Sequence, residues 1–182
     1  MVDRFKNGNS RNDKSIIDPD LNNLVNFHGG DLKGITRKIS EGYFSDLGVN
    51  MLWISPVLKN PDSSRTESVF PFRRYSGYHG YWPVSSMKID PHFGTDEDLL
   101  ELVSTAHANG IKVILDFVAN HVHEDHQYFI EHPEWFSSYL GEDGTANLRK
   151  WDGETRLTTW FESFLPSFDY KQNIKAVSTV SG

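Results

Sequence analysis

The apolar positions of residues 32–57 predict a helix followed by a buried strand. Side chains recur there at helical spacing until a glycine supplies a stop. The members of this stripe and its terminating glycine are Leu32, Ile35, Ile39, Tyr43, Leu47 and Gly48. Residues 49–57 then form a short apolar run closed by Pro56, which is typical of a strand buried on both faces.

The same order recurs further along the chain. Thr95 can cap a helix with Asp98 at its third position, an apolar stripe follows, and Gly110 ends it before a second strand over residues 111–117. Helix, strand, loop, helix, strand is typical of right-handed β/α units with a parallel sheet, so we expect an α/β fold. Residues 1–5 are a further strand candidate, followed by a loop rich in Asn, Asp, Gly and Ser over residues 6–26.

Composition narrows the function classes. The 182 residues carry 18 basic and 25 acidic side chains, a formal charge of −7, which argues against a nucleic-acid or anionic-membrane binder. The absence of cysteine excludes disulfides, thiolate zinc sites and a cysteine nucleophile. No apolar run approaches the roughly 20 residues of a membrane span, and no signal peptide is predicted. The compartment stays undecided.

The ends of parallel strands are where polar side chains gather in α/β folds. Asp116, Asn120 and His121 follow the second confident strand, where burial is tolerated only if they are paired or bind something. A strand-ending turn with satisfied polar groups is the alternative. The long segments over residues 58–94 and 121–166 are irregular, and the second reads as an inserted excursion.

A second pattern overlaps this string. His121, His123, Asp125 and His126 have the HxHxDH spacing of metallo-β-lactamase-like hydrolases, which could hold two zinc ions. That superfamily needs later histidine ligands, and only His132 follows. A solvated loop is the alternative for His123 and His126.

Two loops carry candidate binding chemistry. Hard oxygen donors at near-alternate spacing, with glycines for tight turns, suit a calcium loop other than an EF-hand, although ordinary turns explain them too. These residues are Asn7, Asn9, Asn12, Asp13, Gly29 and Asp31. The aromatic and glycine-rich loop over residues 75–83 suits the flat faces of sugar rings, with local packing as the alternative.

Taken together, these strings resemble the N-terminal part of α-amylase-type enzymes, glycoside hydrolase family thirteen, and especially its neopullulanase and cyclomaltodextrinase-like members. The strings are residues 1–8, 27–35, 50–56, 77–83, 116–121 and 164–169. The resemblance implies a partial (β/α)8 TIM barrel, its first three β/α units, with an inserted B-type subdomain after the third strand. Residues 1–120 would belong to the barrel, 121–166 to the inserted subdomain and 167–182 to the return.

The resemblance also assigns roles to residues. Tyr81 would stack on the glucose at the cleavage subsite, His121 would hydrogen-bond that sugar, and His79 and Trp82 would also bind substrate. Asp116 would be structural, bracing an arginine from a later strand. Calcium would bind Asn120 and, separately, the loop of Asn7, Asn9, Asn12, Asp13, Gly29 and Asp31. The partner would be an α-glucan or maltooligosaccharide, with neither nucleic acid nor membrane involved.

One departure from the family limits the expected activity. Retaining cleavage uses two carboxylates about 5 to 5.5 Å apart, and the family places them after later strands than these. No Gly-x-Arg-x-Asp string occurs, and no carboxylate follows Asp169. No catalytic residue is therefore assigned within the chain, and the nucleophile and the acid/base are expected beyond Gly182.

We accordingly expect an N-terminal fragment, inactive alone, of a glucan hydrolase. A glucanotransferase fragment and a non-catalytic carbohydrate-binding remnant are the alternatives. Three strands cannot close an eight-stranded barrel, so the open sheet edge predicts self-association.

Overall fold

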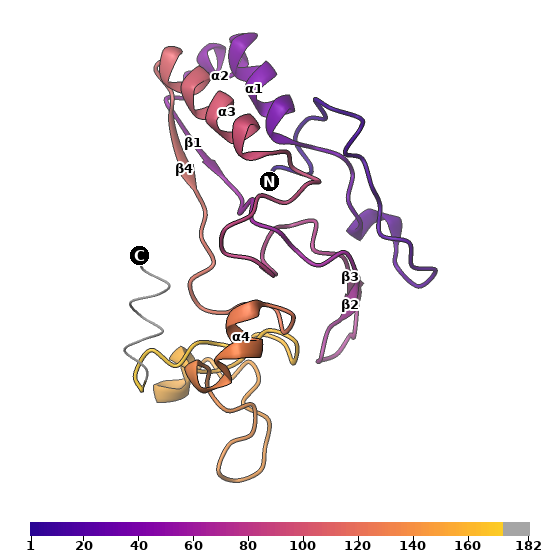
Figure 1. Ribbon diagram of the computed structural model, residues 1–182, viewed down its shortest axis with the longest axis vertical. Coiled ribbons are helices and arrows are strands. Elements are labelled where there is room, and N and C mark those ends of the chain that lie inside the picture. The colour runs from indigo at the N-terminus through magenta and orange to yellow at the C-terminus, as the bar shows by residue number, and fades with distance from the viewer. Residues whose placement is uncertain (173–182) are drawn as a thin grey trace.

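Two parallel strands with helices along one face form one end of the fold (Figure 1). The computed structural model describes residues 1–172. Strand β1 (Met51–Ile54) pairs with β4 (Lys112–Leu115), with Met51 opposite Lys112 and Ile54 opposite Leu115. Helix α3 (Asp96–Ala108) precedes β4 in the crossover between them. This arrangement confirms the predicted α/β class with parallel pairing.

Helix α3 begins where the sequence predicts. Thr95 accepts the backbone N–H of Asp98, and the Asp98 carboxylate accepts the N–H of Thr95, which completes a capping box. The helix packs against α1 (Leu32–Ser40), whose own cap is Asp31, accepting the N–H of Gly34 at 2.6 Å. Each start is therefore fixed by a side chain that satisfies a free backbone donor.

The first predicted helix is two helices rather than one. Helix α1 ends at Ser40, and α2 (Tyr43–Asp46) follows after Gly42, whose φ of 80° is left-handed. A glycine adopts that conformation without the steric strain of a side chain, so it breaks the helix while the apolar spacing continues.

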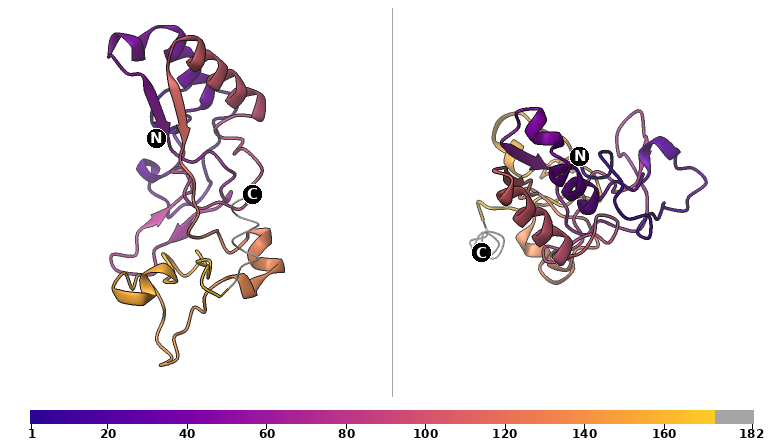
Figure 2. Two further views of the ribbon diagram at one scale, coloured as in Figure 1. Left: turned by 90° about the vertical axis from the view of Figure 1, so that its left-hand side faces the viewer. Right: turned by 90° about the horizontal axis from the view of Figure 1, so that it is seen from above.

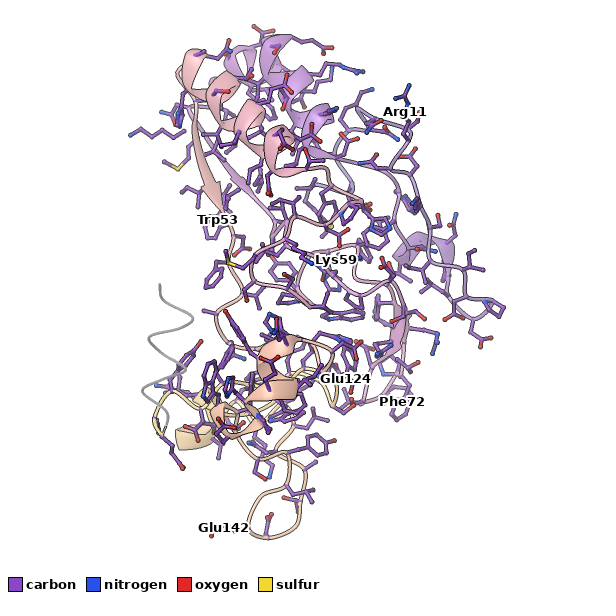
Figure 3. All side chains as sticks on the ribbon, in the orientation of Figure 1. Arg11, Trp53, Lys59, Phe72, Glu124 and Glu142 are labelled. Atoms are coloured by element: carbon purple, nitrogen blue, oxygen red, sulfur yellow. The ribbon has the colours of Figure 1, made fainter. Side chains whose placement is uncertain are left out.

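The helices cover one face of the strand pair. A core cluster joins the two helices to the strands and to the loop ahead of α1; its buried members are Val2, Phe27, Leu32, Ile35, Ile39, Ile54, Val57, Phe93, Leu102, Ala106 and Ile111. On the other face Met51, Trp53 and Ile114 are exposed, Trp53 by 71% (Figure 3). The expectation that residues 49–57 are buried on both faces is therefore wrong, because no described element covers that side.

Residues 1–5 form a turn instead of the expected strand. The N–H of Phe5 donates to the carbonyl of Val2 at 3.1 Å. Asp3 is buried and binds the segment ahead of α1: its carbonyl accepts from Gly30 at 2.8 Å and its carboxylate from His28 at 2.9 Å. The N–H groups of His28 and Gly30 take the place of the hydrogen bonds that a neighbouring strand would supply, so residues 1–5 are held in position without joining the sheet.

The loops of residues 58–94 contain a short hairpin, β2 (Arg65–Thr66) and β3 (Arg74–Tyr75), paired antiparallel. A 3-10 turn, η1 (Asn23–Val25), lies in the N-terminal loop. Figures 1 and 2 show the hairpin beside the segment after β4, away from α1 and α3. The predicted irregular loop is thus largely confirmed, with a small hairpin added.

The segment after β4 leaves the sheet and returns to its own starting point. It contains α4 (Gln127–Glu131), η2 (Pro133–Trp135) and η3 (Gly153–Leu157). Its ends are hydrogen-bonded: Val122 donates to the carbonyl of Pro166 at 3.2 Å, and Phe168 to that of Asn120 at 3.0 Å. One small apolar cluster lies within this segment and comprises Val122, Trp135, Phe136 and Phe168. A second cluster joins Phe164 and Leu165 of the segment to Trp82 of the aromatic loop.

The proposed boundaries at residues 120/121 and 166/167 stay a prediction, and residues 173–182 of the last part lie outside the described residues. The catalytic carboxylates are expected beyond Gly182, which also lies outside the described residues. Their position therefore stays a prediction. Within residues 1–172, no helix has the length and apolar character needed to cross a membrane.

Candidate functional site

A pocket of about 340 Å³ lies between the aromatic loop of residues 75–83, Glu67 of the β2–β3 hairpin and residues 120–168, the returning segment. The three parts of the chain meet there because the returning segment packs on Trp82 through Phe164. The side chains that line the pocket include Tyr78, His79, Tyr81, Trp82, His121 and Phe161. All four substrate-binding residues predicted from the sequence therefore lie around one cavity.

Tyr81 is held by the carboxylate at the end of β4. Its hydroxyl donates to Asp116 Oδ2 at 2.6 Å. This hydrogen bond, together with desolvation and the negative charge of Asp116, raises the pKa of Tyr81 to about 12. The ring is 39% exposed, so one apolar face remains available while the polar tip is fixed.

His121 lines the same pocket and contacts the backbone of Tyr81. Its Nε2 lies 3.0 Å from the Tyr81 carbonyl oxygen, so Nε2 carries the proton and donates. Nδ1 is then an acceptor, 3.4 Å from the Asn120 amide nitrogen. Burial lowers the pKa of His121, which keeps the imidazole neutral near pH 7.

His79 and Trp82 build the wall behind Tyr81. His79 Nδ1 accepts the N–H of Tyr81 at 2.9 Å, and burial lowers the pKa of His79 to about 4. The buried Trp82 ring meets His79 edge-on at a centroid distance of 4.8 Å. Trp82 therefore shapes the pocket through packing, whereas the ring of Tyr81 presents a surface to it.

Asp116 has a structural partner within the described chain. One of its carboxylate oxygens accepts from Tyr81, and the other accepts the N–H of Phe117 at 2.9 Å. The bracing of a later arginine stays a prediction.

A charged cluster that no sequence pattern indicated also lines the pocket. Glu162 is 2% exposed and is bonded to the Arg149 guanidinium and to the N–H of Ser68, the latter at 2.7 Å. Glu67 lies 3.8 Å from the same guanidinium. The sequence signal that could have revealed this cluster is Glu162, a carboxylate flanked by Phe161 and Phe164, because a charge among apolar side chains requires a partner when it is buried.

The calcium-loop residues come together in part. Asn7 Nδ2 donates to Asp13 Oδ2 at 2.7 Å, and a Cβ on Gly29 would lie 2.5 Å from Asp13 Oδ1 and 2.8 Å from Asn7 Nδ2. Asn12 Oδ1 is buried without a hydrogen-bond partner. An orphaned oxygen and a backbone held against a carboxylate fit a hard cation.

Two members of the predicted set already have protein partners. The buried Asp31 carboxylate accepts the N–H groups of Gly8, Asn9 and Gly34. Asn9 Oδ1 accepts the N–H of Arg11 at 3.3 Å. Asp31 therefore organises the loop whether or not a cation binds.

Asn120 donates to Ser167 Oγ at 3.2 Å, which joins the start of the returning segment to its end. Within residues 1–172, no group of three or more His, Cys, Asp or Glu side chains could hold a metal ion. The calcium role of Asn120 stays a prediction without a supporting acidic cluster.

The zinc interpretation of the HxHxDH spacing is wrong. His123 and His126 are buried, and their Nδ1 atoms accept the N–H groups of Asp125 and Tyr128 at 3.1 and 3.0 Å. Burial lowers the pKa of each to about 4. They are neither a zinc pair with His121 nor solvated loop residues, because each ring is buried and accepts the backbone N–H two residues further along the chain.

Comparisons with known proteins agree with the fold. The family described as alpha amylase, catalytic domain, matches residues 1–160. A cyclomaltodextrin glucanotransferase from Bacillus licheniformis is 44% identical over 128 residues, 66% of this chain and 17% of that protein. The chain thus spans less than a fifth of this curated relative.

Solved structures resemble nearly the whole chain. An α-amylase from Anoxybacillus matches with a TM-score of 0.74 and 31% identity, over 99% of this chain and 35% of that one. An α-amylase from Geobacillus thermoleovorans, complexed with acarbose, matches with a TM-score of 0.70 and 34% identity, over 99% and 34%. With the family match over most of its length, the chain belongs to the alpha-amylase catalytic-domain family.

Proposed function

We propose that this chain supplies the sugar-holding part of a retaining α-glucan-processing enzyme. Tyr81 stacks on a glucose ring, and His121 hydrogen-bonds the same sugar. The observation that carries the proposal is the shared pocket of these two side chains, joined by the 3.0 Å contact between His121 and the Tyr81 carbonyl.

The chemistry of the pocket suits a neutral, hydroxyl-rich ligand. Aromatic faces match the apolar faces of sugar rings. The Nε2–H of neutral His121 is donated to the Tyr81 carbonyl, so His121 would accept from a sugar hydroxyl at Nδ1, in exchange for its 3.4 Å contact with Asn120. The charges of Arg149 and Glu162 compensate one another in the wall. The pocket therefore offers ring faces and hydrogen bonds without a net attraction for anions.

The finer fold assignment belongs to this proposal. Strands β1 and β4 are the second and third strands of a (β/α)8 barrel, and residues 121–166 are the inserted B-type subdomain. The parallel pairing of β1 with β4 supports the first statement. The hydrogen bonds between residues 120–122 and 166–168 support the second, because an inserted unit must begin and end side by side.

Turnover by these 182 residues alone is not expected. Retaining cleavage needs a carboxylate nucleophile and a carboxyl acid/base about 5 to 5.5 Å apart. The pocket carboxylates, Glu67 and Glu162, both face Arg149, and the sequence holds no Gly-x-Arg-x-Asp string. Hydrolysis is the proposed reaction of the whole enzyme. Glucan transfer is the second candidate, favoured by the similarity to cyclomaltodextrin glucanotransferase.

Calcium is the proposed cofactor. It would bind the loop of Asn7, Asn9, Asn12, Asp13, Gly29 and Asp31, and the same chain would bind a second ion at Asn120. When bound, the first ion would supply positive charge that ties the N-terminal loop to the segment ahead of α1. The orphaned Asn12 oxygen supports the first site.

The exposed face of β1 and β4 supports a further part of the proposal, self-association of the chain. Met51, Trp53 and Ile114 present adjacent apolar side chains there, and apolar patches of this kind favour association. Sedimentation at several concentrations would test it, and a monomer throughout would contradict it.

Calorimetric titration with maltoheptaose tests sugar binding. We expect saturable binding by the unaltered chain, a loss of about tenfold in affinity in Tyr81→Ala, and no change in Tyr43→Ala. Tyr43 is a matched control because it is 43% exposed and lies on α2. No binding by the unaltered chain, or equal affinity in Tyr81→Ala, would overturn the proposal. Hydrolysis of starch by the purified chain would refute the expected inactivity.

A further inference from the structure

Arg149 lines the pocket in an unusual backbone conformation. Its φ of 50° lies in the left-handed region, which is strained for a residue that carries a side chain. Such strain persists only where surrounding contacts impose it, and it is common at functional sites. The Arg149 N–H donates to the Trp160 carbonyl at 2.8 Å, and the N–H of Lys150 donates to Thr159 Oγ1 at 2.8 Å. The backbone of Arg149 is therefore held in a conformation that glycine would adopt more readily.

The guanidinium of Arg149 makes contacts in three directions. It is bonded to the Glu162 carboxylate, its Nε donates to the Phe161 carbonyl at 3.0 Å, and its Nη2 lies 3.8 Å from a Glu67 oxygen. Glu162 is buried, and its second oxygen accepts the N–H of Ser68 at 2.7 Å. A buried carboxylate requires partners of this kind. The ion pair with Glu162 therefore holds the side chain of Arg149 in one position.

Phe161 connects this ion pair to the sugar pocket. The guanidinium carbon of Arg149 lies 5.2 Å from the centroid of the Phe161 ring. The Phe161 ring in turn stacks on His121, with a centroid distance of 6.0 Å and an interplanar angle of 27°. One edge of the His121 imidazole is held by the Tyr81 carbonyl. Contact with Phe161 on the ring face restricts the tilt that a single hydrogen bond at the edge leaves free.

A purely structural role for the ion pair is the alternative, and a second ion pair offers a control for it. The β2–β3 hairpin also contacts the returning segment through Arg65, whose guanidinium lies 3.2 Å from Glu124 and 3.5 Å from Asp125. Neither Arg65 nor Glu124 lines the pocket. Changes at Arg65 therefore test a general hold on the hairpin, whereas changes at Arg149 also test the hold on Phe161.

We propose that Arg149 and Glu162 are positioning residues that orient the His121 imidazole through the Phe161 ring. The strained backbone of Arg149 and the buried charge of Glu162 each oppose folding, so stability alone does not explain their place beside His121. An imidazole that is oriented in advance loses less entropy when it binds a hydroxyl. This inference rests on the proposed function, which gives the orientation of His121 its purpose.

Nuclear magnetic resonance of the His121 ring tests the positioning on the complete 182-residue chain without a ligand. At pH 8 we expect nuclear Overhauser contacts between the ring protons of His121 and Phe161. Arg149→Lys keeps the positive charge but lacks the Nε–H and the forked geometry, so these contacts should be lost and the His121 ring shifts should move. Arg65→Lys makes the same change in the control ion pair and should leave both signals as they are. Retained contacts and shifts in Arg149→Lys would overturn the proposal.

A double variant keeps the experiment decisive if Arg149→Lys does not fold. Arg149→Gly combined with Glu162→Gln suits the positive φ, removes both charges together and leaves an amide oxygen for the Ser68 N–H. Near-ultraviolet circular dichroism should show that it folds, and the contacts between the two rings should be lost. Retained contacts in this variant refute the positioning. If neither variant folds, the role of the ion pair is structural, and the proposal is refuted.

Calorimetric titration with maltoheptaose measures the consequence for binding. Arg149→Lys should lower the affinity by about two- to tenfold, the ordering cost of one side chain, whereas Arg65→Lys should not change it. If the unaltered chain does not bind maltoheptaose while the ring contacts respond as expected, the proposed function fails and the positioning of His121 stands. If the unaltered chain binds, retained ring contacts or unchanged affinity in Arg149→Lys refute the positioning alone.

Discussion

The hydrogen bond between Tyr81 and Asp116 is expected to stabilise the fold as well as to orient the sugar-facing ring. We would remove each partner separately, as Tyr81→Phe and Asp116→Ala, and then both together. The donor and acceptor are 2.6 Å apart, which is the distance range of a hydrogen bond to a charged oxygen. The bond links the loop after β1 to the end of β4, so its loss should loosen that connection.

The size of the effect follows from the pKa of Tyr81 and its exposure. A rise from 10 to about 12 would correspond to about 2.7 kcal/mol in a fully shielded site. Because Tyr81 is 39% exposed, solvent screening reduces this figure, and we expect a coupling of about 1 kcal/mol. The folded state holds the tyrosine proton more tightly, so the contribution is complete below pH 10 and is lost as the pH rises through about 12.

Urea unfolding of the four proteins at pH 8 measures the coupling. Each single variant should lower the free energy of unfolding, and the double variant should lose about 1 kcal/mol less than the sum of the two. Changes that add within about 0.3 kcal/mol would refute the reasoning, since independent sites behave in that way. The backbone bond from Phe117 to Asp116 is lost in both Asp116 variants and therefore cancels in the cycle.

Two further predictions concern the calcium loop and the buried histidines. If calcium binds the loop, it should raise the melting temperature of the unaltered chain, and Gly29→Ala should abolish that rise because the added methyl group would lie 2.5 Å from Asp13 Oδ1. Gly42→Ala, with a similar positive φ but open space around it, should keep the calcium response, and equal responses in both would contradict the site. Burial lowers the pKa values of His79, His123 and His126 to about 4. The unfolded chain therefore binds these protons first, and the free energy of unfolding should fall by about 1 kcal/mol per pH unit for each histidine as the pH is lowered from 6.5 to 4. Urea melts at pH 7 and 5 check this, His126→Gln should reduce the slope, and equal stability at both pH values would refute it.

Local signals in the sequence predicted the framework well. Thr95 and Asp98 form the cap that their spacing indicates, and the strands after each helix pair in parallel. The predictions were wrong where residues far away in the sequence determine the local structure. Val2 and its neighbours looked like a strand, but the buried Asp3 carboxylate bonds to His28 instead. The burial of a strand face likewise depends on what covers it, as exposed Trp53 shows.

The pocket was predictable only in part. Tyr81 and His121 stood out because aromatic and polar residues followed predicted strands, and the structure brings them together. Arg149 and Glu162 were missed, because they lie in a segment without periodicity and are joined to the pocket by tertiary pairing. His123 and His126 show the opposite error, since a ligand-like spacing arises when each ring caps its own turn.

The bond between Glu162 and Ser68 joins parts of the chain 94 residues apart. The hairpin and the returning segment consequently form one wall of the pocket, and neither is a separable module. Chimeras with related enzymes should exchange both segments as a unit, because replacing one would leave a buried carboxylate facing a foreign backbone. Complementary shape where the hairpin contacts the returning segment, more than overall sequence similarity, should decide which chimeras fold.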